Sequence, residues 1–190
     1  NNGAAYDYAL SNLDFMILGP STNQILYNNF HYGSYRGTIF AGASGKGLGH
    51  GVDGARKGLR YESLGAGGFS LINSQIVAIQ NQPGTYYIET ASGFTGTAHL
   101  FNADFWGQPI SSINMSGSGT LNLHQGNFNS PGSSAFANIT NGSLKLNNSA
   151  VRLVNPLLSS GSAPRFSVQS SFIDPLGINK DSCALWKNNQ

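Results

Sequence analysis

The fold is decided by the stretch FSLINSQI at residues 69–76, because the same pattern returns four times further along the chain. The later copies keep the order of apolar and polar residues, and they are AHLFNADF (98–105), LNLHQGNF (121–128), LKLNNSAV (144–151) and FSVQSSFI (166–173). The second apolar position recurs at intervals of 29, 23, 23 and 22 residues, at Leu71, Leu100, Leu123, Leu146 and Val168. A period in the twenties indicates a solenoid.

Each copy predicts a strand, a bend and a second strand. The alternation of apolar and polar residues before the bend is typical of a strand that buries one face. The bend position is mostly an amide residue, and it is held by Asn73, Asn102, Gln125, Asn148 and Ser170. Asn tolerates the left-handed backbone of a tight bend, and its side chain can bond to the same amide one coil away. We therefore predict stacked coils with an internal amide ladder.

The alternation also predicts outward side chains that form columns along the stack. One column is Ser70, His99, Asn122, Lys145 and Ser167, and another is Gln75, Asp104, Asn127, Ala150 and Phe172. Neighbouring coils lie ~4.8 Å apart. Such a column can serve as a ruler along which sugar units lie.

The composition fits one folded β domain. The chain has 190 residues, of which 39% are hydrophobic and only 9% are charged, against a typical quarter. A chain of low charge that is rich in Gly, Asn and Ser usually works outside the cell, so we expect an extracellular, secreted protein. We interpret residues 1–190 as a single β-helix domain that is a section of a longer solenoid, since no cap is visible at its start.

Three segments depart from the regular pattern. Residues 34–66, with AGASGKGLGHG at 41–51, predict a Gly-rich irregular insertion, because such glycine density marks a loop or a close approach to a ligand. Residues 176–190 predict a non-repeating C-terminal tail, in which Leu185 and Trp186 could cover the last coil. YALSNLDF (8–15) and ILYNNFHY (25–32) predict two early coils, and we expect no substantial helix.

The stretch FNADFWG (101–107), followed by GTLNLHQGNF (119–128), resembles the later coils of right-handed parallel β-helix proteins. The chain is most similar to the pectate-lyase superfamily, and within it to secreted bacterial proteins related to glycosyl hydrolase family 28. The resemblance covers about residues 67 to 175. It implies an all-β, right-handed parallel β-helix with coils of about 22 to 29 residues, in a protein that acts on carbohydrate.

Glycoside hydrolysis needs a pair of carboxylates, roughly 5 Å apart for retention or 6.5–9.5 Å for inversion. Asp53 and Glu62 flank the Gly-rich region, where either could meet Asp14 from an earlier coil. Asp104 and Trp106 are expected on one side of a strand, and an acid beside an exposed ring is a common way to hold a pyranose. We take Asp53, Glu62 and Asp104 as candidate catalytic acids.

Candidate substrate-binding residues come from the Gly-rich region and the outward columns. Gly49-His50-Gly51 resembles the Gly-His-Gly segment of polygalacturonases, although the adjacent Asp pair of that family is absent here. Arg56 and Lys57 belong to the one basic cluster, which a lyase would need beside an acidic sugar. The full candidate set is His50, Arg56, Lys57, His99 and Trp106. The histidines show no metal-ligand spacing, so neither a metal nor a cofactor is predicted.

A polysaccharide is therefore the expected partner. The net charge of +2 gives no reason to expect a nucleic acid, and no apolar stretch is long enough for a membrane span. The rival hypothesis is a non-catalytic structural or adhesive β-helix, such as a fibre or tailspike segment. Such a protein would associate with copies of itself or with another fragment through apolar residues exposed at coil ends.

Overall fold

The computed structural model describes residues 3–79, 83–130, 132, 134–152, 158–159, 165–173 and 183–187. It contains one helix, α1 (Ala4–Asn12), among these residues. The longer strands are β1 (Asp14–Leu18), β2 (Ser21–Ala78), β3 (Tyr86–Thr90), β4 (Thr97–Gly107), β5 (Ser111–Met115), β6 (Thr120–His124), β8 (Ala135–Ile139), β9 (Ser143–Asn147), β12 (Arg165–Gln169) and β14 (Cys183–Lys187). The shortest are β7 (Asn127–Phe128), β10 (Ala150–Val151), β11 (Leu158–Ser159) and β13 (Phe172–Ile173).

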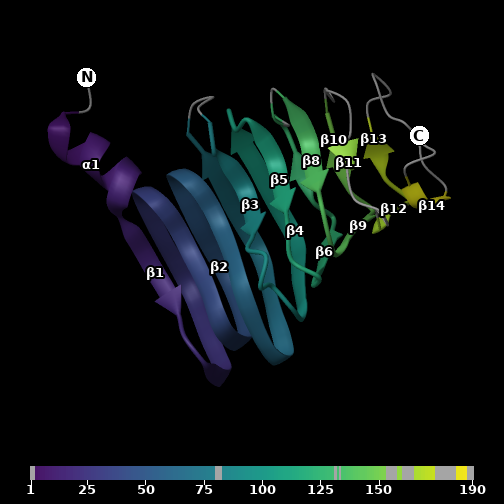
Figure 1. Cartoon of the computed structure of the whole chain (residues 1–190), viewed down its shortest axis with the longest axis horizontal. Helices are drawn as coiled ribbons and strands as arrows, with labels where there is room; N and C mark the ends of the chain where they lie inside the picture. The colour runs from purple at the N-terminus through teal and green to yellow at the C-terminus, as the bar shows by residue number, and fades with distance from the viewer. Residues whose placement is uncertain are drawn as a thin grey trace.

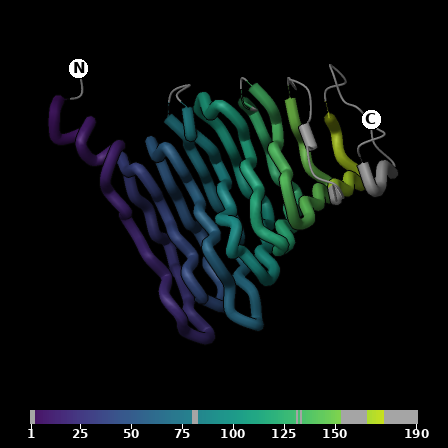
Figure 2. The backbone as a smooth tube through the Cα atoms, in the orientation of Figure 1, coloured from purple at the N-terminus to yellow at the C-terminus, as the bar shows by residue number. Residues whose placement is uncertain are grey.

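The strands form a parallel β-helix of about six coils, which confirms the predicted fold class. Figure 1 shows successive coils that lie side by side from α1 at one end to β14 at the other, and Figure 2 shows the backbone winding through these coils. Three stacks of strands run along the solenoid after β2. Stack A is β4, β6, β9, β12 and β14; stack B is the second half of β4, β7, β10 and β13; stack C is β3, β5, β8 and β11. The long β2 supplies the strands that begin these stacks.

The predicted apolar columns form the core. Leu71, Leu100, Leu123, Leu146 and Val168 stand in parallel register and are all fully buried. Rings stack in the same way behind stack B, where Phe105 and Phe128 lie 4.2 Å apart at an interplanar angle of 4°. Burying one such side chain contributes about 1.5–3 kcal/mol. The interior is thus a set of similar apolar contacts repeated along the axis.

The five predicted bend residues all have a left-handed backbone, with φ between 48° and 56°. Asn102 Nδ2 donates to Asn73 Oδ1 at 2.9 Å, which confirms one rung of the amide ladder. After the bend a buried hydroxyl bonds across the coils: Gly126 N donates to Ser149 Oγ, and Ser149 N donates to Ser171 Oγ, both at 3.0 Å. At Ser149 and Ser171 the small residue after the bend therefore also holds neighbouring coils together.

The prediction of an irregular insertion at 34–66 is wrong, because all of these residues lie within β2. The coil over residues 42–52 packs against the coil before it at a spacing of 21 residues. A Cβ at Gly47 would lie 2.7 Å from Leu71 Cδ2 and 3.3 Å from Leu26 Cβ, and a Cβ at Gly51 would lie 2.7 Å from Phe30 Cδ2. These glycines admit the side chains of neighbouring coils, so they tighten the solenoid where a loop was expected.

Both ends of the chain also correct the sequence-based predictions. Residues 8–12, taken as part of an early coil, belong to α1, which buries none of its side chains. In the copy at 25–32 the left-handed residue is Asn28 rather than Asn29, so Ile25 and Tyr27 point outward and are 70% and 67% exposed. The tail contributes β14, which pairs in parallel with β12. The rest of that tail lies outside the described residues.

Within the part of the chain that the structure describes, no helix has the length and apolar character needed to cross a membrane.

The bend predicts a graded effect of substitution at Asn102. Asn102→Ala should lower the free energy of unfolding by about 1–2 kcal/mol, because Ala lacks the tolerance of Asn for φ near 51°. Asn102→Gly should cost less, since glycine relieves the backbone and only the exposed ladder bond is lost. Urea denaturation of both variants measures the difference. Equal losses would contradict a left-handed constraint at this position.

Candidate functional site

The strand register confirms the alignment of the two predicted columns, although Asn122 in the first of them is buried rather than outward. Ser70, His99, Asn122, Lys145 and Ser167 are successive partners along stack A. Gln75, Asp104, Asn127, Ala150 and Phe172 are successive partners along stack B. Asn127 Nδ2 donates to Asp104 Oδ1 at 2.9 Å, so side chains within a column contact one another across coils.

A third column, which the sequence reasoning did not single out, carries apolar and aromatic side chains. Leu26 and Leu71 flank Gly47 on the interior side, so the residue after each of them points outward by alternation. Ile72 is then followed in register by Phe101 and His124. We call this column the outer stripe, and its members are Tyr27, Leu48, Ile72, Phe101 and His124. The first three are 67%, 42% and 36% exposed.

Three rings at the centre of this face form a nearly parallel stack. Phe101 lies 4.6 Å from His124 at an interplanar angle of 10°, and 5.9 Å from His99 at 8°. The two imidazoles are 5.9 Å apart at 17°. Asn122 Nδ2 lies 3.5 Å from His99 Nδ1 and places a polar group at the edge of the rings. Burial lowers the pKa of His124, with a smaller effect from His99, which favours a neutral ring.

A groove of about 560 Å³ opens beside the stripe. Ile72 and Phe101 form its apolar wall, while Lys46, Ser70 and Asn23 supply polar groups. This volume falls within the range of ligand sites, which combine apolar surface with a few polar groups. The arrangement can hold a molecule that has both apolar faces and hydroxyl groups.

The three candidate acids are not brought together. Asp104 is exposed on stack B and bonds to Asn127. Asp53 lies in β2 close enough to α1 to contribute to the raised pKa of Tyr6, of which burial is the main cause. Glu62 contacts Arg36 and Arg60. Among the described contacts, none joins any two of Asp53, Glu62 and Asp104.

Glu62 belongs instead to a chain of ion pairs that crosses several coils beside stack C. Arg60 Nε lies 3.0 Å from Glu62 Oε1, and Arg60 also binds Glu89. Lys57 Nζ lies 2.9 Å from Glu89 Oε1. The members in order are Asp14, Arg36, Glu62, Arg60, Glu89 and Lys57. The sequence allowed Asp53 or Glu62 to meet Asp14, and Glu62 does lie near Asp14 because both bind Arg36. Two carboxylates that are neutralised by a shared arginine favour a structural role.

The remaining candidate residues are spread over the surface and the interior. Lys57 is one of the ion-paired residues and also lies 5.3 Å from the Tyr35 ring centre. Arg56 is partly buried, and its Nε has no hydrogen-bond partner among the described residues. Trp106 is 41% exposed on stack B, two residues from Asp104 as predicted. Of the predicted binding residues, only His99 borders the outer stripe.

His50 points into the protein rather than toward a ligand at the surface. It is 1% exposed, and its Nε2 lies 2.8 Å from Thr38 Oγ1, which is also 3.2 Å from Nε2 of buried His31. Since one hydroxyl donates a single proton, it donates to one ring and accepts from the other. Burial lowers the pKa of both histidines to about 4, and for His31 the charge of His50 adds to the effect.

Groups of three or more histidine, cysteine or acidic residues that could hold a metal do not occur among the described residues. Comparisons of the chain with protein-family models, curated proteins and solved structures gave no match. By its geometry the protein belongs to the class of parallel β-helices, and it carries stacked aromatic rings on its outer face.

The buried histidine pair predicts a loss of stability in mild acid. Between pH 6.5 and 4 the unfolded chain binds protons that folded His31 and His50 do not, so the free energy of unfolding falls as the pH falls through this window. The loss should be of the order of 3 kcal/mol for each histidine.

Urea denaturation between pH 7.5 and 4 measures this slope. A His31→Gln and His50→Gln double variant should show a flatter dependence than the wild type, while the partly exposed His99→Gln should keep it. An unchanged slope in the double variant would mean that other groups cause the acid sensitivity.

Proposed function

We propose that this protein is a secreted, carbohydrate-binding β-helix that holds a polysaccharide along its outer stripe. The observation that carries the proposal is the ring stack of His99, Phe101 and His124 beside a groove with polar walls. Pyranose rings have apolar CH faces that stack on aromatic side chains and hydroxyls that bond to polar ones. The coil spacing of ~4.8 Å repeats these contacts along the solenoid axis.

The resemblance of residues 67–175 to the pectate-lyase superfamily supports the same substrate class. We rank binding above hydrolysis, because hydrolysis needs two carboxylates facing one sugar, one of them protonated. Glu62 is held by two arginines, and Asp53 and Asp104 share no contact among the described residues. Hydrolysis by Asp53 and Asp104 would require a substrate that reaches across separate parts of the surface.

A second candidate function is self-association of a structural or adhesive β-helix. Large apolar side chains gather in the first coil, where Phe15, Ile17, Phe30 and Tyr32 are between 45% and 62% exposed. Exposed apolar surface of this kind marks interaction sites. Light scattering at two concentrations separates the candidates: a monomer that binds polysaccharide supports the first, and concentration-dependent growth without glycan binding supports the second.

Substitution at the centre of the stripe tests the binding proposal. Phe101→Ala should weaken binding of a neutral oligosaccharide about tenfold, because an aromatic contact of this kind contributes about 1.4 kcal/mol. Isothermal titration calorimetry measures the change. Phe172→Ala is the matched control, since Phe172 is 50% exposed on stack B, away from the groove.

Equal binding by the wild type and Phe101→Ala, or an equal loss in Phe172→Ala, would contradict a binding site on the outer stripe. Circular dichroism of both variants checks that the β-helix persists.

A further inference from the structure

The column of left-handed bends has one position without a side chain. Asn28, Gly49, Asn73 and Asn102 occupy the bend in four successive coils, and all have positive φ. Only Gly49, with φ of 68°, carries no amide. A Cβ placed there would overlap Asn28 Oδ1. The amide ladder is therefore interrupted for one coil, and we call this gap the notch.

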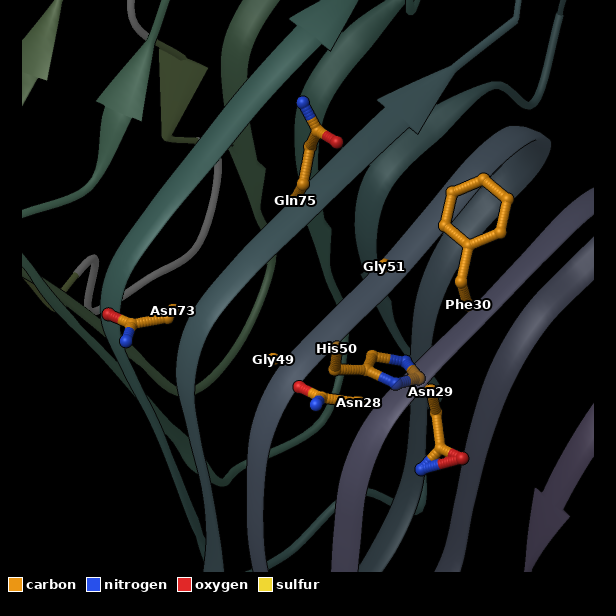
Figure 3. A pocket seen from close by; sticks show the side chains of 8 residues that line it. All are labelled: Asn28, Asn29, Phe30, Gly49, His50, Gly51, Asn73 and Gln75. Atoms are coloured by element: carbon orange, nitrogen blue, oxygen red, sulfur yellow. The ribbon is translucent and has the colours of Figure 1, made fainter.

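The notch is an open pocket of about 270 Å³. Figure 3 shows Asn28 and Asn73 on either side of Gly49, with Phe30 beyond Asn28 on one coil and Gln75 beyond Asn73 on another. Leu48 and Ile72 of the outer stripe directly precede Gly49 and Asn73 in the chain. A ligand that lies on the stripe can thus extend a substituent over the bend into the notch.

The direction of the hydrogen bonds in the ladder defines which ligand group the notch can bind. Asn102 Nδ2 donates to Asn73 Oδ1, so the donors point toward the preceding coil. Asn73 Nδ2 has no acceptor among the described residues, and Asn28 presents its Oδ1 to the notch from the other side (Figure 3). The missing layer must therefore accept a hydrogen bond on one side and donate one on the other.

A secondary amide meets this requirement, because its C=O and N–H point in opposite directions. A carboxylate accepts on both sides and cannot donate to Asn28 Oδ1. We propose that the notch binds the acetamido group of an N-acetylated hexosamine in a polysaccharide held on the outer stripe. This inference rests on the proposed function. Phe30, which is 62% exposed, offers an apolar surface to the methyl group.

Three β-1,4-linked tetrasaccharides test the inference by titration calorimetry with the whole chain. They share one backbone and carry an acetamido group, a hydroxyl or a free amine at C2. The acetylated tetramer should bind about tenfold more tightly than the other two, as expected for two additional neutral hydrogen bonds. A glutamine-containing peptide serves as the fourth ligand, because it offers amides without sugar rings.

Gly49→Asn is the decisive variant, because Asn tolerates a left-handed backbone and would restore the missing rung. The new Cβ would overlap Asn28 Oδ1, so only the outer end of the Asn28 side chain has to move. This variant should bind the acetylated tetramer no better than the hydroxyl tetramer. Gly84→Asn is the matched control, since Gly84 has φ of 79° and open space around its Cβ direction. It should keep the wild-type preference.

The outcomes separate this inference from the proposed function. Equal binding of the acetylated and hydroxyl tetramers by the wild type overturns the acetamido site and leaves glycan binding intact. Binding of neither tetramer overturns both. A preference that survives in Gly49→Asn places recognition outside the notch, and equal affinity for the peptide overturns the assignment to a glycan.

Discussion

The rest of this structure follows from the stacking of one coil on the next in parallel register. Residues of the paired strands lie above their equivalents in the preceding coil, so the same type of side chain recurs at the same position along the axis. Leucine above leucine forms an apolar core, and a left-handed residue above a left-handed residue keeps each bend at the same corner. The same rule aligns His124 with Phe101 on the outside. The register that aligns the core residues therefore also aligns the side chains on the surface.

Much of this could be predicted from the repeat. The buried column from Leu71 to Val168, the five left-handed bends and both outward columns follow from alternation and from the amide at each bend. The outer stripe could also be predicted from this alternation. Ile72, Phe101 and His124 each directly precede a bend residue, so alternation places them in one column on the solvent side.

Other features were hidden because local sequence did not determine them. The sequence of residues 8–12 matches the repeat, but these residues form part of a helix. A strand of the repeat needs a neighbouring coil with which it can pair. At 25–32 a shift of one residue exchanged inside for outside, as any strand slip does. Glycines such as Gly47 suggested a loop, although they make room for Leu26 and Leu71. Apart from Arg60 and Glu62, the ion pairs join residues 22 to 32 positions apart, so only the coil register reveals them.

An NMR titration of the backbone amides with an oligosaccharide measures whether a glycan lies along the outer stripe. A glycan on the outer stripe should shift the amide resonances along stack A through Ile72, Phe101 and His124, and should leave those of stack C around Glu89 unchanged. Changes centred on stack C, or none at saturating oligosaccharide, would contradict it.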